Sequence, residues 1–329
     1  MRNIELLRVT LTPALLCWLL VGAARRYALR HQILDHPGPR ASHTQPTPRG
    51  GGLGLVAAVL LVLLMVSGVR SNASLLLALA GVALTALIGW LDDRSSLGVR
   101  ARLMAHLAAG AMLLPLALWP SAVPAWMGMF AGFWWIFWAV SAINVVNFMD
   151  GIDGLIGSQA VIFGAYLALL GGSGGMAGVV GLVLTGASTG FLLWNWPPAR
   201  IFLGDVGSGA LGLLFVLGGL LLIREGRATV VIAFLPLYPL FLDATVTLLR
   251  RLRRGERVTE AHRSHLYQRL ANGSWGHARV TVLYAAMAAA ALPIALLPPG
   301  WMSPAIAAYF ICVLGLGVAL DRHSARLRR

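Results

Sequence analysis

Long apolar segments separated by short polar connections constrain the fold of this chain more than any other feature of its sequence. Hydrophobic residues make up 58% of the 329 residues and charged residues only 12%, too few polar side chains for a soluble surface. A membrane-spanning helix needs about 20 mostly apolar residues. We count about eleven such segments: 6–24, 51–69, 74–91, 103–119, 124–143, 155–172, 176–195, 207–223, 228–248, 279–297 and 302–320. We therefore predict an all-α, polytopic integral membrane protein with about 11 transmembrane helices and a single domain over residues 1–329.

The arginines indicate how these helices are oriented. The chain has 26 basic residues, all of them Arg, and all but five lie in or beside alternate connections or in the tail after residue 320. These connections are 25–50, 92–102, 144–154, 196–206 and 249–278. Positively charged loops stay in the cytoplasm. We therefore predict that the N-terminus lies outside and that the Arg-rich loops and the C-terminus are cytoplasmic. The net charge of +14 does not indicate nucleic-acid binding, because no extra-membrane domain is large enough to present a basic face.

Most of the few acidic residues fall in the same connections. LDDR ends the third apolar segment, NVVNFMDGIDGL follows the fifth and FLGDVGS precedes the eighth. Short loops hold their side chains near the membrane surface, so carboxylates from these three loops should converge. They would repel one another unless a cation neutralises them, and oxygen ligands favour hard ions such as Mg²⁺ or Mn²⁺. We expect a divalent metal site formed by Asp92, Asp93, Asp150, Asp153 and Asp205.

Two further loops carry groups that suit phosphate oxygens. The Pro- and Gly-rich stretch DHPGPRASHTQPTPRGGGLG, residues 35–54, presents Arg40, His43 and Arg49. The stretch HRSHLYQRL in the last large loop, residues 262–270, clusters two histidines with an arginine. Guanidinium forks and His donors bind phosphate well. Carboxylates facing such groups are typical of chemistry on a diphosphate.

Each motif also has a purely structural explanation. The acidic pair could be a solvated helix end, the Asp-Gly pairs a helix stop, Asp205 an N-cap, and the HRSH cluster a solvated basic loop. Their joint occurrence on one face favours a site. A membrane transporter or lipid flippase with a cytoplasm-facing acidic coupling site is the alternative function. Transport favours ionisable residues near the mid-bilayer and a repeat between the two halves. Only Asp243 lies inside an apolar segment, and no convincing repeat is present.

Taken together and in this order, the motifs resemble the polyprenyl-phosphate N-acetylhexosamine-1-phosphate transferase superfamily, glycosyltransferase family 4. The loop 35–54 is similar to the family's first cytoplasmic loop, LDD to its acidic pair, NVVNFMDGIDGL to its Asn-Asp-Gly motif, FLGD to its metal motif and HRSHLYQRL to its His-rich last loop. The form HRSHLYQ looks more like the branch that initiates O-antigen or capsule repeat units than the peptidoglycan branch.

The resemblance implies a Mg²⁺-dependent enzyme, with Mn²⁺ as an alternative ion, whose single transmembrane catalytic domain lies in the bacterial cytoplasmic (inner) membrane. It would transfer a sugar 1-phosphate from a UDP-N-acetylhexosamine to undecaprenyl phosphate on the cytoplasmic face and release UMP. The product would be the lipid-linked first sugar of an O-antigen lipopolysaccharide, a capsule or another cell-envelope polysaccharide. The identity of the sugar stays open, as does the choice between direct attack and a covalent enzyme phosphate. Membrane lipids are expected partners, and the Gly-rich segment 171–190 would permit a homodimer.

The resemblance also assigns roles around the donor. Asp205 and Asn147 should bind Mg²⁺ with the diphosphate, while Asp153 and Phe202 should contact the uracil. Asn144, Asn147, Asp150 and Asp153 are spaced by three residues, a step that drifts by roughly 60° on an ideal helix. They cannot all face one ion unless the helix breaks, which Gly151 and Gly154 favour. Asn144 and Asp150 are then supporting residues of the substrate site.

Other residues should serve the acceptor and the transferred group. Asp92 and Asp93 should lie beside the lipid phosphate, with Asp92 positioned to deprotonate or orient it. Arg102 stands where the family often has a lysine, so the positive charge is kept with a different geometry. The His-rich loop should hold the diphosphate and sugar. The candidate catalytic residues are Asp92, Asp93, Asp205 and His262, and the further candidate substrate contacts are Arg49, Arg102, Arg263 and His265.

Overall fold

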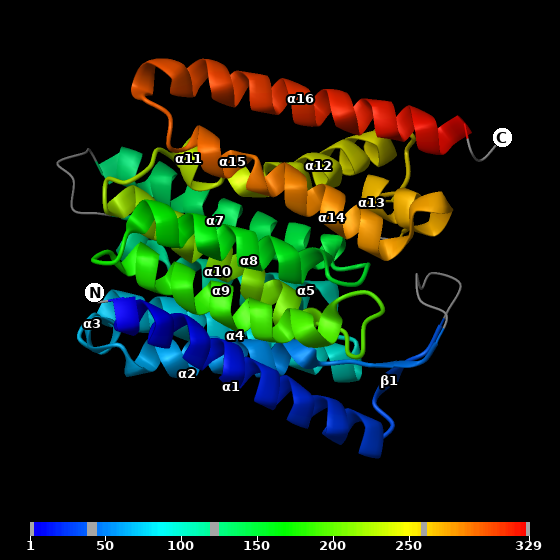
Figure 1. The fold of residues 1–329 in the computed structure, drawn as a ribbon, viewed down its shortest axis with the longest axis horizontal. Helices are drawn as coiled ribbons and strands as arrows, with labels where there is room; N and C mark the ends of the chain where they lie inside the picture. The colour runs from blue at the N-terminus through cyan, green and yellow to red at the C-terminus, as the bar shows by residue number, and fades with distance from the viewer. Residues whose placement is uncertain (1–2, 38–44, 119–124, 258–261, 327–329) are drawn as a thin grey trace.

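The structure is a computed structural model that describes residues 3–37, 45–118, 125–257 and 262–326. Arg40 and His43 of the first predicted loop lie outside these ranges. The chain is almost entirely helical, and the predicted all-α class is confirmed (Figure 1). Its only strands in the described ranges are the short antiparallel pair β1 (Leu34–Asp35) and β2 (Thr47–Pro48).

The helices follow the predicted apolar segments closely. Their bounds are α1 (Asn3–Arg30), α2 (Gly51–Met65), α3 (Ser67–Arg70), α4 (Ala73–Ser95), α5 (Val99–Ala111), α6 (Leu114–Ala117), α7 (Ala125–Met149), α8 (Leu155–Gly171), α9 (Met176–Asn195), α10 (Asp205–Arg224), α11 (Val230–Ala233), η1 (Leu235–Leu237), α12 (Tyr238–Arg253), α13 (Leu266–Leu270), the π-helical turn η2 (Ala271–Trp275), α14 (Gly276–Ala289), α15 (Ala291–Ile294) and α16 (Pro299–Arg326).

Eight helical stretches within the described ranges are long and apolar enough to cross a membrane, and α2 and α8 are shorter apolar helices. This is the pattern of a multi-pass membrane protein, while the count of eleven spans and their orientation stay predictions. The predicted ninth segment, 228–248, is not one helix but is divided into α11, η1 and α12. Pro236 and Pro239 lie at these breaks, and proline has no N–H for a continuous helical hydrogen-bond ladder.

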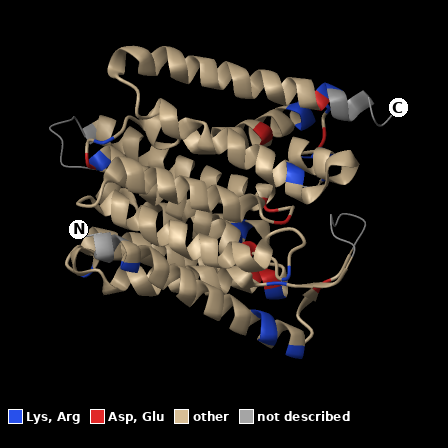
Figure 2. Ribbon diagram, in the orientation of Figure 1, with Lys and Arg blue, Asp and Glu red and all other residues tan. Residues whose placement is uncertain are grey.

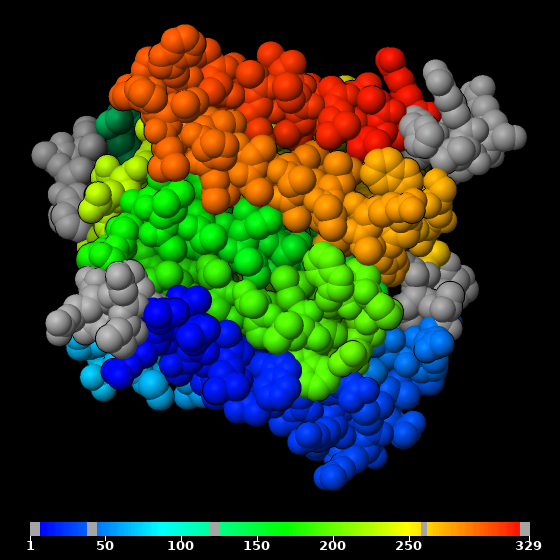
Figure 3. Space-filling model, in the orientation of Figure 1, coloured from blue at the N-terminus to red at the C-terminus, as the bar shows by residue number. Residues whose placement is uncertain are grey.

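Helix α10 forms the centre of the bundle, and every residue from Val206 to Leu222 is buried. It packs against α2, α4, α7 and α8. Helices α1 and α16 lie at opposite edges, as the blue and red ends of the space-filling view show (Figures 1 and 3). Only 17% of the apolar window of each of these two helices is buried. Their exposed apolar side chains are suited to contact lipid.

Glycines bring three helices together where α10 begins. A side-chain carbon added at Gly89 of α4 would lie 2.3 Å from the carbonyl oxygen of Asp205. One added at Gly52 of α2 would lie 2.3 Å from the Cα atom of Gly207. Such distances are far below van der Waals contact, so only glycine allows this packing. The start of α10 is therefore in direct backbone contact with both neighbours.

Charged side chains gather at one end of the bundle, the end where the chain's C-terminus lies (Figure 2). Arg224, Glu225 and Arg227 lie at the opposite end, after α10. The convergence of acids and arginines that the sequence predicted therefore exists in the folded chain, and the candidate site lies within it.

Candidate functional site

A polar cavity of about 210 Å³ opens at the charged end of the bundle. The loop between α7 and α8, the segment between α9 and α10, and the region around α13 form its walls. Its charged and amide-bearing lining residues are Asp35, Arg49, Asn147, Asp150, Asp153, Asn195, Asp205, Arg263, Gln268 and Asn272, together with the ring of Phe202. Seven predicted site residues, from four separate motifs, thus line one cavity: Arg49, Asn147, Asp150, Asp153, Phe202, Asp205 and Arg263.

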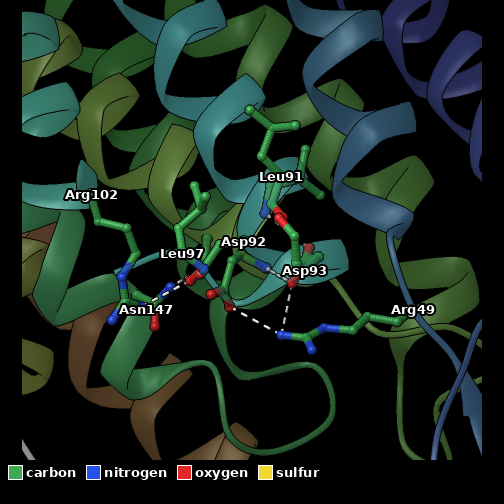
Figure 4. Close-up of polar contacts among 11 residues, drawn as sticks. Arg49, Leu91, Asp92, Asp93, Leu97, Arg102 and Asn147 are labelled. Atoms are coloured by element: carbon green, nitrogen blue, oxygen red, sulfur yellow. Dashed lines mark hydrogen bonds and ion pairs between the residues drawn. The ribbon is translucent and has the colours of Figure 1, made fainter. Parts of the chain in front are cut away.

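Arg49 links two of the carboxylates. Its Nη2 atom lies 2.8 Å from Oδ1 of Asp93 and 3.2 Å from Oδ1 of Asp205 (Figure 4). The backbone fixes its position, because the N–H of Phe202 donates to the carbonyl of Pro48 and the N–H of Gly51 donates to the carbonyl of Phe202. Burial lowers the pKa of Arg49, but the carboxylates of Asp93 and Asp205 more than offset this and the pKa is raised. Arg49 is therefore a fixed cation.

Asp93 receives the first N–H groups of α10. Its Oδ1 atom accepts from the N–H of Asp205 at 3.2 Å, and its Oδ2 atom accepts from the N–H of Val206 at 3.3 Å. These backbone groups have no partner inside the helix, and the helix dipole favours an anion there. Gly204 precedes them with a φ of +76°, and a side-chain carbon there would lie 2.7 Å from Asp93. A glycine is required at this position.

Asp92 turns toward Arg102, whereas the adjacent Asp93 turns toward Arg49 (Figure 4). Its Oδ2 atom pairs with Nη1 of Arg102 at 2.9 Å, and its Oδ1 atom accepts from the N–H of Leu97 at 2.5 Å. Nearby, Nδ2 of Asn147 donates to the hydroxyl of Ser208 at 3.3 Å. Because the NH₂ group is engaged, the carbonyl oxygen of Asn147 is the atom suited to a metal.

The end of NVVNFMDGIDGL forms an ordered turn. Asp153 accepts a hydrogen bond from the N–H of Ala199 at 3.0 Å, and its Oδ2 lies 3.2 Å from Nδ1 of His277. Asn195 accepts from the N–H of Gly154 at 2.9 Å and donates to the carbonyl of Ile201 at 3.0 Å. The expected helix break is present, because α7 ends at Met149 and α8 begins at Leu155. This turn positions Asp153 and the segment that carries Phe202.

Asn144 lies about one helical turn before Asn147 in α7. Its Nδ2 atom donates to the carbonyl of Val140 within α7 at 2.7 Å, and it is not among the residues that line the cavity. The supporting role that the sequence assigned to Asn144 stays a prediction.

Asp150 provides a pH-dependent test. Burial raises the pKa of its carboxyl well above the ordinary value, and the nearby Asp205 carboxylate raises it further. The folded protein therefore holds this proton more tightly than the unfolded chain, and stability falls as the pH rises above about 4. We expect Asp150→Asn, which cannot ionise, to melt at a higher temperature than the parent at pH 8, and this advantage to shrink steadily as the pH is lowered toward about 4. Thermal unfolding in metal-free detergent solution measures this, and a lower melting temperature at pH 8 would contradict it.

The His-rich loop is only partly at the cavity. Arg263 lines it, together with Gln268 and Asn272, which the sequence did not single out. His265 is buried, with Nδ1 3.8 Å from Oδ1 of Asp243. His262 lies beside Ser264, with Nδ1 2.9 Å from its hydroxyl. Burial and the neighbouring His265 lower the pKa of His262 to about 4, so its ring is neutral at physiological pH. Neither histidine lines the cavity, and their assigned roles stay predictions.

Asp243, the only acid inside an apolar segment, has a structural task. Its carboxylate accepts hydrogen bonds from the N–H groups of Leu266 and Tyr267, which begin α13, at 2.8 and 3.1 Å. It also accepts from the hydroxyls of Tyr284 and Thr247 at 2.7 and 3.2 Å. This buried carboxylate holds α12, α13 and α14 together.

The donor set fits Mg²⁺ held jointly by protein and substrate. Across the described ranges, no group of three or more His, Cys, Asp and Glu residues is arranged to hold a metal by itself. Mg²⁺ does not require such a cage, since it keeps several waters and binds one or two carboxylates together with substrate phosphates. Asp205 and the amide oxygen of Asn147, in one polar cavity, supply hard oxygen ligands of this kind.

A second, apolar groove of about 850 Å³ lies between α1, α2 and α4. Residues such as Ala24, Leu53 and Leu87 line it, and Arg49, Asp93 and Arg94 are among its few charged residues. Arg49 also lines the polar cavity, so the two spaces meet at this residue.

The sequence is similar to a known family and to several named proteins. The family model of glycosyl transferase family 4 matches residues 75–223. A probable undecaprenyl-phosphate N-acetylglucosaminyl 1-phosphate transferase of Bacillus subtilis is 27% identical over 86% of this chain and 81% of its own length. A decaprenyl-phosphate N-acetylglucosaminephosphotransferase of Mycolicibacterium smegmatis is 29% identical over 85% and 78%. A phospho-N-acetylmuramoyl-pentapeptide-transferase of Frankia alni is 31% identical over 62% and 75%.

Proposed function

The chain belongs to glycosyl transferase family 4, and from this membership we propose that it is a polyprenyl-phosphate N-acetylhexosamine-1-phosphate transferase. The donor is a UDP-N-acetylhexosamine and the acceptor is undecaprenyl phosphate. UMP is released, and the lipid diphosphate sugar starts an O-antigen, capsule or other cell-envelope polysaccharide. The reaction takes place on the cytoplasmic face of the inner membrane.

One observation carries the proposal: the polar cavity and the apolar groove meet at Arg49. A water-soluble diphosphate needs polar surroundings, whereas a polyprenyl chain needs apolar ones. Their reacting phosphates must nevertheless come into contact, and a shared cation between the two spaces attracts both. A transporter or flippase is not favoured, because Asp243 is fully engaged in holding three helices together.

The reaction proceeds by direct attack. An oxygen of the lipid phosphate attacks the β-phosphorus of the UDP-sugar, and the bond from that phosphorus to the oxygen bridging to the uridine-bearing phosphate breaks, so that UMP leaves. The lipid phosphate is already anionic and needs little activation. Arg49 and Arg263 offset the charge that develops, and Asp92, paired with Arg102, orients the acceptor. Mg²⁺ held by Asp205 and Asn147 would supply further neutralisation of the diphosphate.

The decisive experiment is an assay of purified protein for UMP release. We expect UMP from a UDP-N-acetylated sugar only when undecaprenyl phosphate and Mg²⁺ are both present, and loss of release after chelation with EDTA. A panel of UDP-GlcNAc, UDP-GalNAc, UDP-QuiNAc and UDP-FucNAc identifies the sugar. Absence of UMP with every nucleotide sugar, with Asp205→Asn indistinguishable from the parent, would refute the proposal.

The predicted contact between Asp153 and the uracil can be tested by substitution. Asp153→Ala is expected to raise the KM for the nucleotide sugar by about tenfold, with a smaller effect on kcat, because a lost ground-state contact weakens binding. Steady-state kinetics of UMP release measures both constants. His277→Gln is the matched control, since it removes the imidazole beside Asp153 but leaves the carboxylate. An unchanged KM in Asp153→Ala would reject the uracil role.

A further inference from the structure

A separate cleft lies between α12, α13, α14 and α16 and shares no lining residue with the candidate site. Its volume is about 150 Å³, and most of its wall is apolar. The apolar lining comes from α12 and α14 on one side and α16 on the other, and includes Leu242, Val246, Met287, Leu314 and Val318. Leu314 and Val318 are 45% and 44% exposed, so the cleft is open to the surroundings of the bundle. At this depth those surroundings are lipid.

One end of the cleft is positively charged. Asp321 of α16 pairs with Arg250 at the end of α12, at 3.0 Å, and with Arg269 of α13. Arg322, the residue after Asp321, is exposed and also lines the cleft. Asp243 also lines the cleft, so the three guanidiniums of the cleft face two carboxylates, which leaves an excess of one positive charge at the same end of the bundle as the other Arg-rich loops (Figure 2).

We propose that this cleft binds an anionic glycerophospholipid, with an acyl chain between α12 and α16 and its phosphate beside Arg250 and Arg322. Basic pockets between membrane helices on the cytoplasmic side are suited to anionic headgroups, and the long Arg side chains can reach the interface from a helix end. A guanidinium also binds phosphate through paired hydrogen bonds.

The cleft does not suit the acceptor of the proposed reaction. An acceptor phosphate must reach the cavity that contains Asp205, and no residue of the cleft lines that cavity. Helix α13 separates the two, with Leu266 and Arg269 lining the cleft and Gln268 lining the cavity. A lipid bound in the cleft would therefore pack behind α13, which forms part of the wall of the site, and would not enter the site itself.

Two variants test the charge of the cleft and its volume separately. Arg322→Gln removes an exposed cation from the cleft. Gly317→Leu fills the cleft, because a side-chain carbon added at Gly317 meets no described atom within 4 Å and leucine favours helix. Arg227→Gln is the matched control, since Arg227 is exposed and follows the end of α10 that lies opposite Asp205.

The test is native mass spectrometry of the purified full-length protein, titrated in detergent with phosphatidylglycerol or with phosphatidylcholine of the same acyl chains. We expect the parent and Arg227→Gln to retain phosphatidylglycerol preferentially, and Arg322→Gln and Gly317→Leu each to bind it at least about fivefold more weakly, since one interfacial Arg contributes about 1 kcal/mol. Equal retention of the two lipids, or equal binding by all four proteins, would overturn the proposal. Displacement of phosphatidylglycerol by equimolar undecaprenyl phosphate would also overturn it, by identifying an acceptor site. The measurement does not use turnover, so its outcome is independent of the proposed reaction.

Discussion

Asp205→Asn is expected to lower kcat for UMP release by about a hundredfold or more while leaving the protein folded. The carboxylate lies at the first residue of α10, 3.2 Å from Arg49, in the cavity that also contains Asn147. The amide keeps the shape and can still contact Arg49 through its oxygen, but it lacks the charge that a divalent ion requires. Loss of one electrostatic group aimed at a developing charge costs about 10²–10³ in kcat. Kinetics at saturating substrates and several Mg²⁺ concentrations would measure the change.

Glu256→Gln is the matched control for Asp205→Asn. Glu256 is an acid at the same end of the bundle that pairs with Arg251 and does not line the cavity, so its neutralisation should leave kcat within about twofold. Both variants should elute like the parent in detergent, and Asp205→Asn should also melt like it. If Asp205→Asn lost its fold, its effect on turnover would reflect the capping of α10, and a normal kcat would exclude a metal role.

Arg49→Gln should have a comparable effect on turnover, with an added cost in stability. The substitution leaves Asp93 and Asp205 close together without their shared cation, and an unpaired buried charge is strongly destabilising. We expect kcat to fall by about a hundredfold and the melting temperature to fall as well. Arg49→Lys should retain more of both, because a single nitrogen, Nη2, makes both contacts and an ammonium can replace it as a point charge.

A double variant distinguishes the two effects of Arg49. Adding Asp93→Asn to Arg49→Gln removes one of the unpaired charges, so part of the lost melting temperature should return. Turnover should not return, because the shared cation is still absent. If turnover recovered together with stability, Arg49 would serve only the fold.

The sequence predicted the parts of the molecule that depend on local composition. Apolar length located the helices, and the one-sided placement of acids and arginines located the charged end. The break in the segment 228–248 was missed because its hydropathy is continuous, although Pro236 and Pro239 were a visible signal. Local patterns could not show that Arg49 bridges Asp93 and Asp205, because that contact joins residues 156 positions apart in the chain.

The residues that sequence reasoning missed in the site are Asp35 and three amides, none of which had been given a role. Asn195, Gln268 and Asn272 line the cavity because of how α9, α13 and η2 end or begin there. Asn195 at least had a signal, a polar residue that closes an apolar segment just before Trp196, Pro197 and Pro198. The task of Asp243 could not be predicted. The sequence assigned it no role beyond its unusual place inside an apolar segment, whereas in the structure it caps a helix that begins 23 residues later.

The close glycine packing at the start of α10 fixes the position of one wall of the site and leaves the opposite wall able to move. Where Gly52, Gly89 and Gly204 bring backbone or carboxylate against α10, no side chain can be enlarged and no helix can slide without a clash. The helix segments that carry Asp93 and Asp205 are therefore held in a fixed position relative to each other. Any closure over a bound donor must come from the opposite wall, around Arg263, Gln268 and Asn272. The same wall is then the place where related enzymes can change their choice of sugar without disturbing the chemistry.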